Sequence, residues 1–361
     1  MNITRRRLAL LAAAVAWLPL AAFSLAQTGS ADVPGASSFW RDVSVHARYL
    51  ISVPLFILAE AFCLPRLWQL IGHFPEAGLI GDLERFAAAV ASGRRSFDSR
   101  RALIWLGVAA LVSAAVIARS HPVAQLPEWH RATGSSEPHS AAGWWHILVS
   151  VPIGLLLLFI WLWRLWVWAH LLRRIARCQL QLIPSHPDRS AGLGFLGSSL
   201  HAFTPVAFAF STIAASREAQ FILSRRAPTS LHLYFNVGVS VFIMVLIVLP
   251  LCAFTPALMR AARRGRLAYG TLALQMGQAF ERRWLAEESP RVTEDELHAP
   301  DFSATIDLYS IVAGAGGLRL MPVTRWHLLR LAAVLAIPFV PVVLLKVPLI
   351  KIWPEIWGLL F

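Results

Sequence analysis

Cysteine is scarce in this sequence, with three residues among 361: Cys63, Cys178 and Cys252. Cys63 and Cys252 lie within long apolar stretches, and Cys178 lies a few residues beyond another one. The loops that the topology below places outside the cell membrane therefore contain no cysteine, and a framework of external disulfides is excluded.

A catalytic constellation is also missing from the sequence. No nucleophile, general base and general acid occur together, so the sequence argues against an enzyme and predicts no cofactor. The formal net charge of +13 would suggest nucleic acid as a partner in a soluble protein. Here the basic residues are dispersed at the ends of apolar stretches instead of forming one patch, so no nucleic-acid partner is expected.

Apolar residues, by contrast, are abundant. They make up 57% of the chain, whereas soluble domains have about 45–50%. They gather in seven stretches, and a helix needs roughly 17–25 residues to cross a bilayer. We therefore predict an all-α, polytopic transmembrane helix bundle that forms a single membrane domain over 1–361, with the lipid bilayer as its partner. The predicted spans are 8–26, 49–70, 102–118, 143–172, 200–221, 233–257 and 328–350.

The positive charges orient these spans. With the N-terminus inside, 24 of the 33 Lys and Arg residues fall on the inner side and 9 on the outer side. Since basic loops stay in the cytoplasm, the pattern predicts an N-in, C-out protein of a bacterial inner membrane. The cytoplasmic loops would be 71–101, 173–199 and 258–327.

Some details of this scheme are open. Span 8–26 resembles a signal peptide, but its long apolar run favours a retained helix. Span 200–221 could be re-entrant, because Arg217 and Glu218 lie near its end. Within the cytoplasmic loops, the apolar spacing of 79–90 predicts a helix lying along the membrane surface, and further helices are expected after 258 and near 301.

A repeat relates two of the hairpins. Residues 50–68 and 148–166 share nine of 19 aligned positions, including Ser-Val-Pro and Arg-Leu-Trp, at an offset of 98 residues. Fixed-period similarity of this kind predicts parallel two-helix hairpin repeats, which occur in some transporters.

Glu60 is the most informative polar residue. It lies in span 49–70, where its repeat partner is Leu158. A carboxylate at membrane depth often marks an ion or proton path, although an ion pair with a neighbouring helix would explain it equally well. Arg217 and Glu218 are similar candidates closer to the outer side, and anchoring is the simpler role for them.

Two loops carry weaker candidates. The outer loop after 118 holds His121, His130 and His139, which are suitable ligand types for zinc or copper but match no compact metal motif. The inner loop after span four holds His186, Asp188 and Arg189, followed by Gly192, Gly194 and Gly197 in a G-x-G-x-x-G pattern. Without a strand before it, this pattern indicates a turn and close helix packing, not a dinucleotide site.

The chain also resembles a family of uncharacterised bacterial multi-pass inner-membrane proteins. The resemblance rests on Val45–Tyr49, Ser52–Glu60, His186–Leu196 and Arg319–Pro322. It implies a multi-pass membrane protein and no particular activity, and it directs attention to Glu60 and the 186–197 loop.

Two functions remain open on this basis. The first is a channel-like or transporter-like core with Glu60 as the ion or proton group. The alternative is a membrane scaffold or a sensor that faces the periplasm without transport. A water-filled cavity that reaches Glu60 would favour the first. The sequence specifies no protein partner or oligomeric state.

Overall fold

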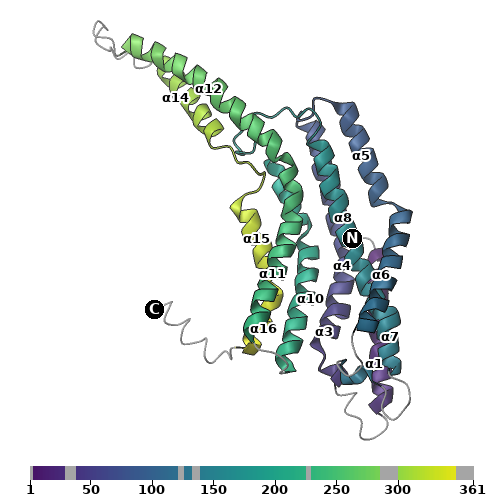
Figure 1. Cartoon of the computed structure of the whole chain (residues 1–361). Coiled ribbons are helices and arrows are strands. Elements are labelled where there is room, and N and C mark those ends of the chain that lie inside the picture. The colour runs from purple at the N-terminus through teal and green to yellow at the C-terminus, as the bar shows by residue number, and fades with distance from the viewer. Residues whose placement is uncertain are drawn as a thin grey trace, which may run out of the picture.

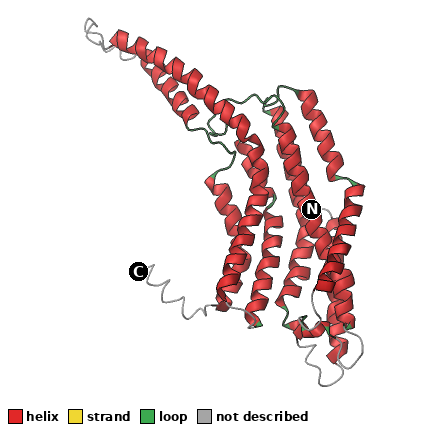
Figure 2. Cartoon of the chain, in the orientation of Figure 1, coloured by secondary structure: helices red, strands yellow, loops and turns green. Residues whose placement is uncertain are grey.

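The computed structural model describes residues 3–28, 38–120, 126–131, 139–224, 229–284 and 300–346. Within this part of the chain, helices form an elongated bundle (Figure 1), and apart from two isolated bridges there is no β-structure (Figure 2). We name the two ends as they stand in Figure 1. The lower end carries α3 and α7, and the upper end carries α5 and the outer part of α12.

The helices follow one another in this order: α1 (Ile3–Thr28), α3 (Val43–His46), α4 (Val53–Glu76), α5 (Leu83–Phe97), α6 (Arg100–Ser120), α7 (Ala141–Trp145), α8 (Val151–Ile175), α9 (Ser199–Ala202), α10 (Thr204–Leu223), α11 (Thr229–Val248), α12 (Thr255–Trp284), α14 (Pro300–Gly316), α15 (Arg325–Ala336) and α16 (Val340–Lys346). Two π-helical segments, η1 (Ala47–Ser52) and η4 (His146–Ser150), join α3 to α4 and α7 to α8.

Six helical segments of the described chain are long and apolar enough to cross a membrane: Ile3–Ala26, Val43–Glu76, Arg100–Ser120, Ala141–Ile175, Tyr234–Arg282 and Arg325–Leu345. They coincide with six of the seven predicted spans, so the polytopic helical fold is confirmed. The remaining prediction, 200–221, corresponds to α9 and α10. Arg217, Glu218 and Gln220 lower the hydropathy of α10, and it is not among the six.

Helix α10 nevertheless lies inside the bundle. It packs against α4, α11 and α15, and its polar residues Ser211 and Ser216 are buried. The hydroxyl of Ser211 donates to the carbonyl of Leu335 on α15 at 2.6 Å. The polar side chains of α10 therefore face protein, which removes the penalty that lipid would impose on them.

Hydrogen bonds of this kind join the other helices as well. The buried indole of Trp161 on α8 donates to the carbonyl of Phe56 on α4 at 3.0 Å. Since apolar surface is no better off in protein than in lipid tails, packing and interhelical hydrogen bonds hold such bundles together. The outward faces are apolar, as on α6, where Ile104 and Trp105 are 66% and 72% exposed.

The predicted repeat coincides with a repeated local geometry. The N-cap residues Asp42 and Ser140 are 98 positions apart, and each accepts a backbone N–H three residues later. A π-helical segment follows in both places, and then Val-Pro opens the long helix. Ser52 and Ser150, again 98 apart, are fully buried and donate to carbonyls of α10 and α1. Helix α1 packs on α4 in one hairpin, and α6 packs on α8 in the other.

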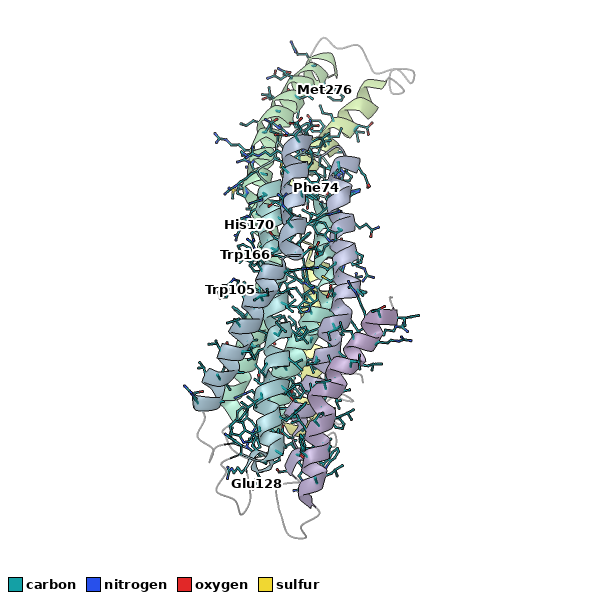
Figure 3. The ribbon with its side chains drawn as sticks, turned by 90° about the vertical axis from the view of Figure 1, so that its right-hand side faces the viewer. Phe74, Trp105, Glu128, Trp166, His170 and Met276 are labelled. Carbon is teal, nitrogen blue, oxygen red and sulfur yellow. The ribbon has the colours of Figure 1, made fainter. Side chains whose placement is uncertain are left out.

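The expected cytoplasmic helices are present as α5, α12 and α14. Helix α12 continues the direction of the preceding span and forms a projecting hairpin with α14, with Met276 in its outer part (Figures 1 and 3). The expectation that α5 lies along the membrane surface is wrong. It runs beside the upper part of α8, and a Cβ at Gly93 would meet the side chain of Leu171 at 3.1 Å.

Candidate functional site

Glu60 makes two ion pairs between helices. Its Oε1 lies 3.3 Å from Nη2 of Arg5 on α1, and its Oε2 lies 3.1 Å from Nη2 of Arg164 on α8. Arg164 is the least exposed of the three at 13%, and its guanidinium also lies over the ring of Trp161. Arg164 is the repeat partner of Arg66, whereas Glu60 replaces a leucine. Glu60, at a position where the other repeat has leucine, thus joins three helices, α1, α4 and α8.

Arg217 and Glu218 point to different surroundings, as expected for neighbours on a helix. The guanidinium of Arg217 lies 5.5 Å from the ring of Phe221 and is exposed, while Glu218 is buried at 4% exposure. Both residues lie in the last turns of α10, at the lower end of the bundle and away from Glu60.

The candidate residues of the inner loop do come together. The carboxylate of Asp188 accepts backbone N–H groups of Ser190 at 2.7 Å, Gly192 at 3.2 Å and Gly194 at 2.8 Å. His186 Nδ1 lies 2.9 Å from Asp188 Oδ1. Partial burial opposes ionisation of Asp188, but these hydrogen bonds outweigh it and lower the pKa of the carboxyl group below its usual range.

The glycines of this loop serve its backbone. Gly192 has φ +94°, and Arg189 also has a positive φ. A Cβ at Gly194 would meet Asp188 Oδ2 at 2.9 Å, and one at Gly197 would meet the ring of His327 at 2.5 Å. Arg189 accepts the N–H of Arg319 through its carbonyl. These contacts make the loop a compact connection that docks on the segment before α15.

The described histidines of the outer loop belong to no cluster of three possible metal ligands. No group of three or more His, Cys, Asp or Glu residues that could hold a metal ion occurs in the part of the chain that the structure describes. His121 lies outside the described residues, and His139 packs on Trp144. His130 instead lies beside His146, with ring centroids 4.7 Å apart.

His130 and His146 line a cavity of about 1050 Å³ at the lower end of the bundle, which we call the lower cavity. Both side chains are buried, at 4% and 8% exposure. Each keeps its Nδ1 without a hydrogen-bond partner among the described residues. Tyr49 approaches His146 Nε2 through its hydroxyl at 3.0 Å. Burial, and then the neighbouring His139, lower the pKa of His130 to about 3, so its ring is neutral at physiological pH.

The rest of the lower cavity is polar at one end and apolar further in. The arginines that line it are Arg41 and Arg48, which lie in the segment leading into α4, and Arg217 on α10. Its acidic residues are Asp42 and Glu128, and Asp42 already accepts N–H groups from Val45 and Trp129. Figure 3 places Glu128 at the lower end. Further along α4, α8 and α10, the lining becomes Val53, Phe56, Leu155, Leu158 and Ile213.

The cavity was not predicted as a site. The sequence presents His146 and Asp42 as ordinary loop residues, since they lie more than 100 positions apart and meet only in the bundle. The repeat offered the one available signal, because the polar residues that begin both repeated helices, Arg48 and His146, occupy aligned positions.

By length and composition of its helices, the chain is a multi-pass membrane protein. It matches no family model, no curated protein and no solved structure. Function therefore has to be argued from the geometry of the site.

Proposed function

We propose that the protein is a membrane receptor that binds an anionic amphiphile in the lower cavity. The positive-inside count supports a periplasmic position for this cavity in a bacterial inner membrane. The proposal gives the predicted periplasm-facing sensor a ligand class. The observation that carries it is a cavity lined by three arginines, Arg41, Arg48 and Arg217, and by apolar side chains further along α4, α8 and α10.

Each part of the cavity suits one part of such a ligand. Arg48 and Arg217 can neutralise an acidic headgroup through charge-assisted hydrogen bonds. From Arg48 to Phe56 the helix rises about 12 Å, which is enough apolar wall for a medium-length alkyl chain.

The transporter hypothesis has less support from the geometry. Both carboxylate oxygens of Glu60 are engaged by arginines, and Glu60 does not line the lower cavity or the cavity at the upper end described below. The two cavities share no lining residue. Neither of these two cavities leads past Glu60, so the receptor is the better-supported proposal.

A fluorescent fatty acid tests the proposal. We expect saturable binding of dansyl-labelled undecanoic acid to the full chain in nanodiscs, and binding at least tenfold weaker for the corresponding alcohol. Replacing both Arg48 and Arg217 with alanine should weaken binding of the acid about tenfold, which is about 1.4 kcal/mol.

A matched pair of glycine variants controls for side effects. Gly154 lines the lower cavity, and the nearest atom to a Cβ there is 3.9 Å away, on Tyr49. Gly107 lies in α6 with nothing within 4 Å. Gly154→Leu should abolish binding by filling the cavity, whereas Gly107→Leu should leave it unchanged. Equal binding by these two variants would contradict the receptor.

A further inference from the structure

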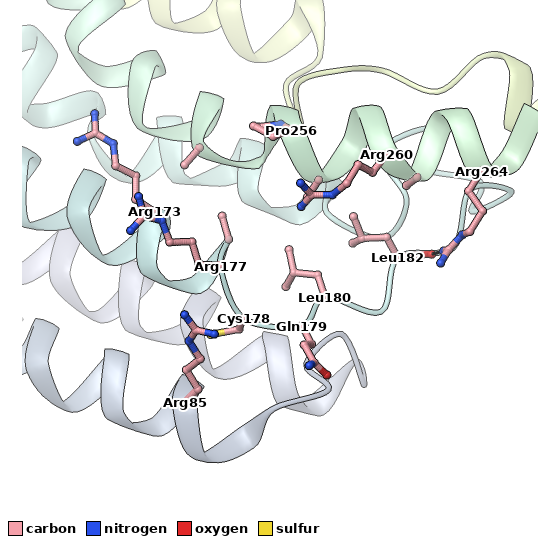
Figure 4. A pocket seen from close by; sticks show the side chains of 14 residues that line it. Arg85, Arg173, Arg177, Cys178, Gln179, Leu180, Leu182, Pro256, Arg260 and Arg264 are labelled. Atoms are coloured by element: carbon pink, nitrogen blue, oxygen red, sulfur yellow. Dashed lines mark hydrogen bonds between the residues drawn. The ribbon is translucent and has the colours of Figure 1, made fainter.

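A second cavity lies at the upper end of the bundle, with a volume of about 870 Å³ (Figure 4). Five arginines line it, and no acidic residue does. They come from three separate parts of the chain: Arg85 from α5, Arg173 and Arg177 from the end of α8 and the turn after it, and Arg260 and Arg264 from α12. Figure 4 shows Arg85 on one side and Arg260 and Arg264 on the other, with residues 178–182 between them.

Orientation in the membrane does not explain this convergence. The positive-inside rule requires only that basic residues lie on one side, and other arginines at this end are engaged elsewhere. Arg94 lies over the ring of Trp68, and Arg174 donates to Ser92. Of the five cavity arginines, Arg264 donates to the carbonyl of Leu182, which holds it at the rim.

The arrangement is electrostatically unfavourable when the cavity contains only water. Arg260 and Arg264 are four residues apart on helix α12, and Arg177 lies in the turn just after α8, four residues beyond Arg173. Like charges at this spacing destabilise a helix by about 0.2–0.5 kcal/mol per pair. A bound polyanion would offset this repulsion, because each guanidinium would then lie beside a negative charge.

We infer that the upper cavity binds a phosphate-bearing anion. Guanidinium groups match phosphate oxygens with two parallel N–H donors, which makes arginine the preferred residue for this group. The volume exceeds the size of a single phosphate and suits a diphosphate or a phospholipid headgroup. The apolar run of α8 ends at Leu172, directly before Arg173, and Ala253 and Pro256 also line the cavity, so it lies at the boundary where headgroups gather.

Two probes distinguish the sources of the phosphate. Purified full-length protein in detergent is titrated with inorganic pyrophosphate by calorimetry, and separately mixed with phosphatidylglycerol or phosphatidylcholine for native mass spectrometry. Saturable pyrophosphate binding assigns a soluble phosphate compound. Selective retention of phosphatidylglycerol assigns a lipid headgroup. The absence of both overturns the inference.

A charge-matched pair of variants tests the location. Arg177→Gln with Arg260→Gln removes one charge from each wall of the cavity. Arg263→Gln with Arg266→Gln removes two exposed charges of the same helix α12 that do not line it. We expect at least tenfold weaker binding for the first pair and less than twofold for the second. Equal weakening in both pairs would mean a general surface field and no site. The Gly154→Leu variant should bind as wild type, so this test is independent of the lower cavity.

Discussion

At the scale of single residues, Glu60 shows how one substitution in a repeat changes its role. Its aligned residue Leu158 needs no partner, whereas Glu60 holds Arg5 and Arg164. The sequence singled out Glu60 as a candidate and included an ion pair with a neighbouring helix among its explanations, and the structure shows such ion pairs. It could not name the partners, because Arg164 lies 104 positions away and only the packing of α4 on α8 brings the two together.

A double-mutant cycle on this pair gives the first prediction. Glu60→Leu should destabilise the protein by about 1–3 kcal/mol, because Arg164 is then largely buried without a counter-charge. Arg164→Leu should cost a similar amount. The double variant should recover much of the loss, giving a favourable coupling that thermal unfolding in detergent would measure.

The exposed pair His73 and Glu76 is the control for this cycle. Glu76 is 75% exposed, and Glu76→Leu should change stability by less than about 0.5 kcal/mol. Simple additivity of the Glu60 and Arg164 effects would show that the two residues do not act as a clamp.

Asp188 gives a prediction about pH. Its pKa is lower in the folded chain than in the unfolded chain, so the folded form favours ionisation. The resulting stability is complete above pH 4 and is lost as pH falls through the lowered pKa. Asp188→Asn should therefore reduce stability at pH 7 by about 1–2 kcal/mol, since hydrogen bonds to a charged acceptor become hydrogen bonds to a neutral one.

The measurement is thermal unfolding of both proteins between pH 3 and pH 7. The difference between wild type and Asp188→Asn should shrink toward the acidic end, where Asp188 of the wild type also becomes neutral. Parallel curves over the whole range would contradict the proposed anchoring of the loop by the ionised carboxylate.

At the scale of helices, apolar periodicity predicted where the helices lie in the sequence, but it did not predict what their side chains contact. Six spans and the helices α5 and α14 follow from the sequence pattern alone. The placement of α5 does not, because an amphipathic helix looks the same whether its apolar face covers lipid or the side of α8. Trp168 illustrates the same limit. It is 1% exposed within the core, whereas Trp166 on the same helix is 52% exposed.

The cavities lie beyond sequence reasoning for a related reason. Each is formed by residues from three or more helices, and none of those helices has an unusual sequence pattern. The two π-helical segments are equally hidden, although they end at the aligned residues Ser52 and Ser150. A π-helical segment shifts the helix face by part of a turn, and such segments are frequent at functional sites. Here both lead into helices that line the lower cavity.

At the scale of the whole molecule, the number of membrane crossings depends on whether α10 crosses the membrane. Hydropathy alone identifies six spans. However, α10 has 20 residues, which corresponds to about 30 Å, and it runs down the lower part of the bundle between other helices. An interior helix can be polar because its neighbours shield it from lipid. We therefore predict that α10 crosses the membrane and that the chain crosses seven times.

Cysteine accessibility can test this crossing at two positions. In a background with Cys63, Cys178 and Cys252 replaced by alanine, single cysteines are placed at Ser185 before α10 and at Ser224 after it. If α10 crosses, a membrane-impermeant maleimide added to intact cells should label position 224 but not position 185, and both should react after the membrane is opened. If neither position is labelled in intact cells, both ends of α10 lie on the inner side of the membrane, and α10 is re-entrant. That result would also remove the periplasmic position of the lower cavity, because Arg217 and Ser224 both line it.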